Sequence, residues 1–121
     1  MGDLVMDVEW LDRPEDHDYD AAASYLQLVM PGDVVADLIP LLRAGPVVQF
    51  KAKDVVRATY MKPLDERNRH VSKDLAKIRR GEALSPVLLV RNTPLTVADG
   101  WHRVCALYLF DEDAFVHGVL V

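Results

Sequence analysis

Hydrophobic residues recur every three or four positions in the first third of the chain, which is the spacing of amphipathic helices. Two helices are predicted there, one that runs to about Met30 and one that begins at Asp33. The pair Pro31-Gly32 between them is typical of a helix end. Their buried faces are expected to consist of Ala22, Tyr25, Leu26 and Val29 in the first helix and of Val34, Leu38 and Leu41 in the second.

Residues with known capping preferences mark the ends of these two helices. Asp18 or Asp20 is expected to cap the first and Asp33 the second, because a short carboxylate accepts hydrogen bonds from the unpaired N–H groups of a first turn. Pro40 removes a backbone hydrogen bond and is expected to kink or shorten the second helix. Gly45 is expected to end it.

After residue 45, short apolar runs alternate with helical spacing. The run Val87–Arg91 is apolar on both faces, as expected for a covered central strand, and a turn at 92–94 predicts that it forms a hairpin with Leu95–Ala98. A strand is also expected at 46–50, a short helix at 53–59 with Val55 and Val56 inward, and a loop at 60–69. A helix is expected at 72–80, capped by Ser72, with Val71, Leu75 and Ile78 buried. A last helix after residue 100, with Val104, Leu107 and Tyr108 inward, and a strand at 115–121 complete the predicted elements.

This order of elements predicts a single α/β (α+β) domain over residues 1–121, in which helices flank a small mixed β-sheet. Residues 1–18 are expected to form an acidic N-terminal arm, and residues 19–45 an N-terminal helical pair. A chain of 121 residues is long enough for one hydrophobic core.

Composition restricts the classes of function. No apolar stretch is long enough to span a bilayer, so no membrane partner is expected. The single cysteine, Cys105, fits a reducing compartment, and the start of the chain lacks the basic residues of a secretory signal, so a cytoplasmic protein is predicted. His17 and His117 do not have the spacing of metal ligands, so no metal site is predicted.

Charge is segregated along the chain, although the net charge is only −5. Residues 1–20 contain eight acidic residues and one basic residue, Arg13, whereas residues 43–103 contain the other thirteen Lys and Arg with six acidic residues. The acidic arm can therefore fold over the basic middle, contact a protein partner or contact a second copy of the chain, and the basic middle can meet an anionic ligand. An ordinary solvated surface explains the same pattern.

The segment Val97–Ala106 predicts a strand, a tight turn and the first turn of a helix. The unpaired N–H groups and the dipole of such a helix favour an anion, and Gly100 lets it approach the backbone closely. His102 and Arg103 oppose the helix dipole unless an anion is bound there, which favours a phosphate site. The alternative is structural: Asp99 caps the helix, Gly100 makes the turn, and both cations are solvated.

Four other side chains are candidates for the same site. His70 precedes the helix expected beside the turn, where it can reach a phosphate or be an ordinary solvent-exposed histidine at the helix entry. Lys51 and Lys53 follow the first strand and can line the same cleft or form an ordinary basic rim. Trp101 can stack on a base or sugar, although tryptophan more often packs against neighbouring side chains.

The string Asp99-Gly100-Trp101-His102-Arg103 resembles the Asp-Gly-x-His-Arg signature of the ParB/sulfiredoxin-like superfamily, which wraps nucleotide phosphates. The resemblance extends back over Val71–Arg91, with Gly81 as the helix stop, and loosely over Val47–Arg57. It implies a ParB/sulfiredoxin-like fold with a nucleotide-phosphate site at the turn.

Within that superfamily the pattern is most similar to a free serine kinase branch that reads Asp-Gly-His-His-Arg. Sulfiredoxins carry Gly-Cys-His-Arg, in which the cysteine is the reducing nucleophile. Trp101 stands at that position here, so this chemistry is not expected, and Cys105 lies further along the helix. ParB partition proteins carry Gly-Glu-Arg-Arg, which binds cytidine triphosphate, and a separate helix-turn-helix domain; no dedicated DNA-reading domain is expected in this sequence.

The resemblance implies a domain that binds a nucleoside triphosphate (ATP or CTP), with Mg²⁺, or a phosphorylated small molecule. A phosphotransferase or nucleotide hydrolase would place Asp99 near the phosphates or the metal ion and use His102 and Arg103 for electrostatic stabilisation. The kinase's separate carboxylate base has no identified position in this sequence. Two other interpretations stay open: a ParB-like nuclease, and a non-enzymatic regulatory or protein-interaction module.

Overall fold

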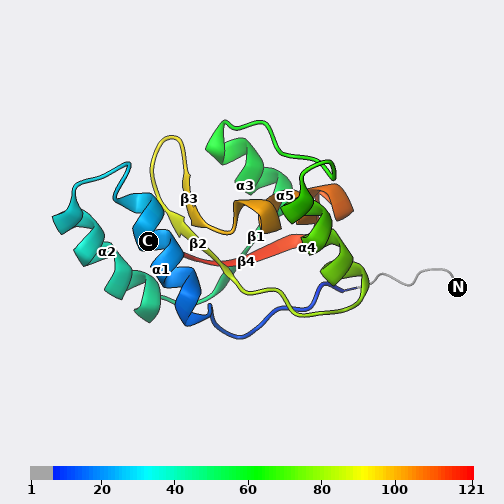
Figure 1. Cartoon of the computed structure of the whole chain (residues 1–121), viewed down its shortest axis with the longest axis horizontal. Helices are drawn as coiled ribbons and strands as arrows, with labels where there is room; N and C mark the ends of the chain where they lie inside the picture. The colour runs from blue at the N-terminus through cyan, green and yellow to red at the C-terminus, as the bar shows by residue number, and fades with distance from the viewer. Residues whose placement is uncertain (1–6) are drawn as a thin grey trace, which may run out of the picture.

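The computed structural model describes residues 7–121, and within them the chain forms five helices and four strands (Figure 1). They are α1 (Asp16–Leu26), α2 (Gly32–Ala44), β1 (Val48–Lys51), α3 (Ala52–Thr59), α4 (Arg69–Arg79), β2 (Val87–Val90), β3 (Thr96–Asp99), α5 (Trp101–Phe110) and β4 (Phe115–Leu120). The prediction of an α/β fold with a small mixed sheet is confirmed. None of these helices has the length and apolar character needed to cross a membrane.

The four strands form one sheet in the order β1-β4-β2-β3. Strand β4 pairs antiparallel with β1 and parallel with β2, and β2 pairs antiparallel with β3 as the predicted hairpin. All four residues of β2 are buried, as the run of apolar residues on both of its faces predicts.

Helices cover both faces of this sheet. Alternate residues of β2 belong to two separate clusters of buried side chains: Val87 and Leu89 pack with α3, α4 and α5, whereas Leu88 and Val90 pack with α1 and α2. In Figure 1, α1 and α2 accordingly lie at one end of the view, away from α3, α4 and α5. The segment Asp99–Arg103 thus begins at the last residue of β3, and its Arg103 reaches Asp18 of α1 in the other layer.

The buried faces of the first two helices differ in part from the expected ones. Ala22 and Leu26 are buried in α1, but Tyr25 is 45% exposed and Val29 lies beyond the helix and is 52% exposed. Helix α1 begins at Asp16, so neither Asp18 nor Asp20 caps it. Asp18 instead lies on the buried face, where its carboxylate also accepts a 2.9 Å hydrogen bond from the backbone N–H of Glu15.

Helix α2 presents the neighbouring stripe to the core. Val35 and Leu42 are buried, whereas Val34 and Leu41, which were expected inside, are exposed. The helix is not shortened at Pro40, and it ends before Gly45 as expected. Its N-cap is Pro31 and not Asp33, and no side chain caps its first turn.

Helix α4 starts at Arg69 because Asn68 caps it. The Asn68 side chain accepts hydrogen bonds from the backbone N–H groups of His70 at 2.9 Å and Val71 at 3.2 Å, so the expected cap at Ser72 is wrong. The predicted buried residues of this helix, Val71, Leu75 and Ile78, are confirmed.

The described part of the acidic arm is held against the loop that precedes β2. Trp10 forms a single parallel bridge with Leu84, flanked by backbone hydrogen bonds from Leu11 to Leu84 and from Leu84 to Glu9. Residues 1–6 of the expected arm lie outside the described residues. Two of its acids pair with the basic middle, Asp16 with Arg43 at 3.3 Å and Asp18 with Arg103 at 3.5 Å.

We expect Leu88→Ala to lower the free energy of unfolding by about 2–5 kcal/mol, because Leu88 is fully buried between the sheet and α1. Leu28→Ala is the matched control: Leu28 is 80% exposed, and its loss should cost less than about 0.5 kcal/mol. Urea denaturation of both variants tests this, and equal losses of stability would contradict the placement of β2 in the core.

Candidate functional site

The signature turn places Gly100 immediately before α5, in the left-handed region with φ at 105°. A Cβ atom at this position would lie 2.5 Å from Cγ1 of Val87, so packing of the turn against β2 requires a glycine even without a ligand. Helix α5 has no side-chain cap. The N–H groups of its first turn are therefore left to solvent or to a ligand.

Arg103 points from α5 back beneath the turn and is held by the protein itself. Its guanidinium forms ion pairs with Asp99 at 2.6 Å and with Asp18 at 3.5 Å. It also donates to the backbone carbonyl of Ser85, to its hydroxyl at 3.0 Å and to the carbonyl of Pro86 at 3.3 Å. These contacts occupy both terminal nitrogens of the guanidinium. They leave Arg103 little freedom to bind a phosphate, which is the role that its position in the turn predicts.

The two carboxylates around Arg103 have pKa values that are displaced in opposite directions. Burial raises the pKa of Asp99 to about 6, a shift that the charge of Arg103 opposes. Burial also acts on Asp18, but hydrogen bonds from Ser85 and from the backbone of Glu15, together with Arg103, hold the pKa of Asp18 below its ordinary value. Both carboxylates are therefore predominantly charged at neutral pH, and Asp99 takes up a proton as the pH falls through about 6, whereas Asp18 stays charged there.

His70 and His102 are brought together from different helices, with ring centroids 4.8 Å apart. Burial, and then the neighbouring His70, lower the pKa of His102, so this ring is predominantly neutral at pH 7. The half-buried Asp74 of α4 acts on His102 in the opposite direction, and burial raises the pKa of Asp74 itself. Of the expected site residues, the fold thus places these two histidines side by side, in addition to the pair of Asp99 and Arg103.

A cleft of about 350 Å³ lies beside the Arg103 cluster. Its lining includes Asp18, Asp74, Lys77, Ser85 and Arg103, contributed by α1, α4, α5 and the loop before β2. The cleft thus joins the buried charges to solvent.

Glu15, His17 and Asp18 at the rim of this cleft have ligand atoms within 4.8 Å of one another, a grouping that the sequence analysis did not expect. Both oxygens of Asp18 are already engaged: Oδ2 accepts hydrogen bonds from Ser85 and Glu15, while Oδ1 faces Arg103 and His17. The chemistry of this group is that of a hydrogen-bonded network, and it does not fit a dedicated metal site.

Lys53 lies at the far end of α5 from the turn. Its ammonium pairs with Asp113 at 2.7 Å, and its backbone N–H donates to the backbone carbonyl of Glu112. Glu112 and Asp113 follow Phe110, the last residue of α5. Ten helical residues span about 15 Å. Lys53, and with it Lys51, which also pairs with Asp113, therefore does not belong to the site at Gly100.

Trp101 and Cys105 have structural positions in α5. Trp101 is partly buried and packs against the core shared with α3 and α4, which is the packing alternative to base stacking. Cys105 is fully buried, its Sγ accepts a hydrogen bond from the backbone of Leu64 at 3.4 Å, and burial raises the pKa of its thiol. A buried thiol of this kind is unreactive, as expected.

Comparisons with protein-family models, with curated proteins and with solved structures find no match to this chain.

We expect Asp99→Asn to change how stability depends on pH. Asp99 binds its proton more tightly in the folded state (pKa about 6) than in the unfolded state, so its contribution is present at low pH and is lost as pH rises through about 6. Relative to Asp99→Asn, the wild-type free energy of unfolding should increase by about 1 kcal/mol between pH 7.5 and pH 5, after allowing for solvent screening.

Urea denaturation at several pH values measures this difference. Asp20→Asn removes an exposed acid of α1 and serves as the control, whose pH dependence should follow that of the wild type. An Asp99→Asn curve parallel to the wild-type curve over this range would contradict the raised pKa.

Proposed function

We propose that this protein binds the phosphate of a nucleoside phosphate or a phosphorylated small molecule at the start of α5, between His70 and His102. The observation that carries the proposal is the convergence of two imidazoles from separate helices beside a helix N-terminus that has no side-chain cap. Backbone N–H groups and imidazole N–H groups are both suited to phosphate oxygens.

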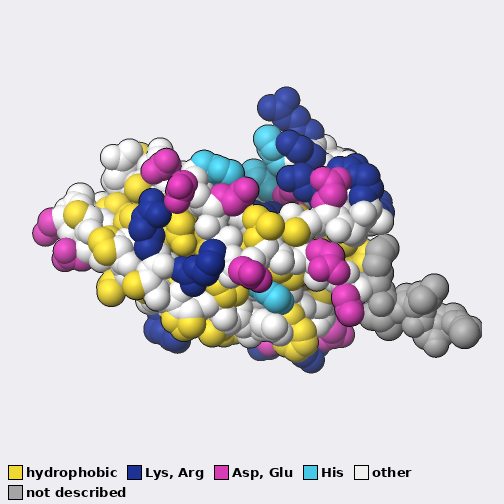
Figure 2. All heavy atoms as spheres, turned by 90° about the horizontal axis from the view of Figure 1, so that it is seen from below, with side chains coloured by type: hydrophobic (Ala, Val, Ile, Leu, Met, Phe, Trp, Pro, Cys, Tyr) yellow, Lys and Arg dark blue, Asp and Glu magenta, His cyan; other side chains and the backbone are white. Residues whose placement is uncertain are grey.

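Positive charge on α4 supports an anionic ligand. Figure 2 shows Lys and Arg side chains gathered with histidine at the end of the molecule where α4 lies. Arg69 and Lys73 are exposed on this helix and form no ion pair with a described acidic residue, unlike Arg67 and Arg80 on either side of them. They are free to attract a phosphate toward the histidine pair.

Arg103 has a positioning role in this proposal. It fixes Asp99, Ser85 and thereby the turn that aims the N–H groups of α5 outward. Phosphoryl transfer or nucleotide hydrolysis would require, in addition, a base that accepts the proton of the attacking hydroxyl or water. Asp74, half-buried with a raised pKa and acting electrostatically on His102, is the carboxylate best suited to that step.

The fit of Mg²⁺ rests on the same carboxylates. Asp99 is bound to Arg103, so Asp74, which acts electrostatically on His102, is the carboxylate left to hold a phosphate-bound ion. When bound, the ion would neutralise phosphate charge. The proposal for phosphate binding does not depend on it.

We expect His102→Ala and His70→Ala each to weaken binding of ATP or CTP about fivefold, the effect of losing one hydrogen bond. Isothermal titration with and without Mg²⁺ measures this, with inorganic tripolyphosphate as a probe that lacks base and sugar. His17→Ala removes a histidine of α1 that is 75% exposed and is the matched control, which should bind as the wild type does.

The pH dependence gives a second measure. The negative charge of a bound phosphate favours protonation of His102, whose pKa burial lowers in the free protein. Affinity should therefore fall between pH 6 and pH 8 more steeply in the wild type than in His102→Ala. Absence of binding by all three probes, or equal affinity in the wild type and both histidine variants, would contradict the proposed site.

A further inference from the structure

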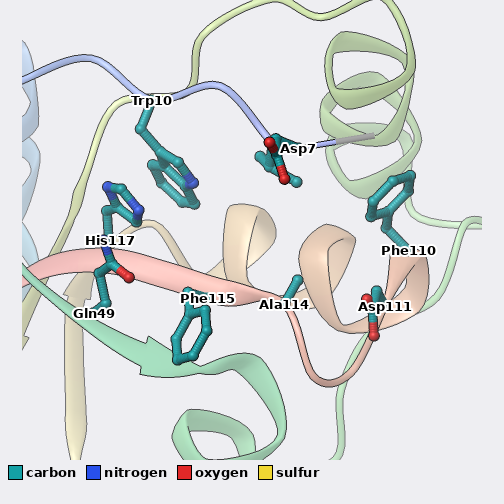
Figure 3. A pocket seen from close by; sticks show the side chains of 9 residues that line it. Asp7, Trp10, Gln49, Phe110, Asp111, Ala114, Phe115 and His117 are labelled. Atoms are coloured by element: carbon teal, nitrogen blue, oxygen red, sulfur yellow. The ribbon is translucent and has the colours of Figure 1, made fainter. Parts of the chain in front are cut away.

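A second cavity, of about 280 Å³, lies between the N-terminal arm, strand β4 and the end of α5 (Figure 3). Its lining includes Asp7 and Trp10 from the arm, His117 from β4 and Asp111 from the segment after α5. Because it adjoins the C-terminal end of α5, it is separated from the turn at Gly100 by the length of that helix, about 15 Å.

Aromatic rings contribute to several sides of the cavity wall. The indole of Trp10 stacks on the imidazole of His117 with centroids 4.9 Å apart and planes only 5° from parallel. His117 thus covers one face of the indole, and the other face lies toward the cavity (Figure 3). Phe110 and Phe115 line other parts of the cavity wall. An open indole face is the strongest cation–π acceptor among protein side chains.

The charge of the lining is negative. Asp7 and Asp111 contribute two carboxylates, and the described residues that line the cavity include no Lys or Arg. Burial lowers the pKa of His117, so this ring does not offset the carboxylates at neutral pH. The nearby Lys51 and Lys53 are both paired with Asp113 outside the cavity.

We propose that this cavity binds an alkylguanidinium group. A planar guanidinium continues the Trp10–His117 stack on the open indole face and directs its N–H groups sideways to Asp7 and to the amide oxygen of Gln49. The attached alkyl chain then packs along Phe110 or Phe115. The volume is near the lower limit of small-molecule pockets, about 300 Å³, and suits a side-chain-sized ligand.

This chemistry has two sources, a free guanidino compound and an arginine side chain of a protein partner. Both place the same guanidinium on Trp10. When the arginine belongs to a peptide, the peptide backbone must also fit at the entrance of the cavity beside Asp111. Butylguanidinium and an acetylated, amidated Gly-Gly-Arg-Gly-Gly peptide distinguish the two sources. Binding of butylguanidinium alone assigns the cavity to a free compound, and binding of the peptide with at least equal affinity assigns it to an arginine of a partner.

The test is an NMR titration that follows the two indole N–H resonances of the protein. Butylguanidinium should shift the resonance of Trp10, identified by its loss in Trp10→Phe, and leave that of Trp101 unchanged. Butylurea has the same shape without the charge and should bind at least tenfold more weakly. Asp7→Asn should weaken butylguanidinium binding about fivefold, and the loss should shrink as salt is raised.

Asp12→Asn is the matched control, since it removes an exposed acid of the same arm that does not line the cavity. It should bind butylguanidinium as the wild type does. Equal binding of butylguanidinium and butylurea, equal effects of Asp7→Asn and Asp12→Asn, or the absence of any shift at Trp10 would overturn the proposal. Unchanged amide spectra of each variant confirm that the fold is intact, so that none of these results can be attributed to unfolding.

Discussion

The ion cluster of Arg103 with Asp18 and Asp99 is the contact on which the arrangement of the layers depends. It joins α1 to the β3–α5 turn across 85 residues of sequence, and the bonds from Arg103 to Ser85 add the loop before β2. Apolar packing between α1 and the sheet has no preferred direction, whereas these bonds fix one position. A buried charge that loses its partner costs about 3–5 kcal/mol, so the three groups are interdependent.

Arg103 and Gly100 both have structural roles in the turn Asp99–Arg103. Gly100 is required by its contact with Val87, and Arg103 is required by the carboxylates beneath it. The side chain of the signature that still faces outward is His102, and α4 places His70 against it. A turn that is rigid on its inner side can present N–H groups to a ligand without reorganisation, which is the property that a phosphate site needs.

The elements whose patterns are local were predictable from the sequence. The β2–β3 hairpin and the place of β4 in the chain follow from short apolar runs with clear breaks between them, and the buried face of α4 follows from apolar residues at helical spacing. Helix α2 was predicted with its neighbouring stripe inward because its apolar residues are adjacent in pairs, at 34–35 and 41–42, and either member of each pair gives helical spacing. The sheet resolves this ambiguity, and nothing local does.

The candidate site was predictable only as far as its turn. The strand, glycine and helix start around Gly100 follow from the sequence, but the partners of Arg103 do not, because Asp18 is indistinguishable from the other acids of the arm. The capping role of Asn68 could have been predicted from the sequence, since asparagine is among the preferred N-cap residues. The stack of Trp10 on His117 joins residues from opposite ends of the described chain and leaves no trace in either segment.

The position of β4 in the sheet has a consequence for the order in which the protein is assembled on the ribosome. Translation delivers the described strands in the order of their numbers, yet β4 lies between β1 and β2. Strand β1 therefore emerges with no neighbour to pair with, and the β2–β3 hairpin forms beside an open edge. Until β4 is released, the edges of β1 and β2 that β4 pairs in the finished sheet have no partner, and unpaired edges of this kind favour aggregation of a partly folded chain.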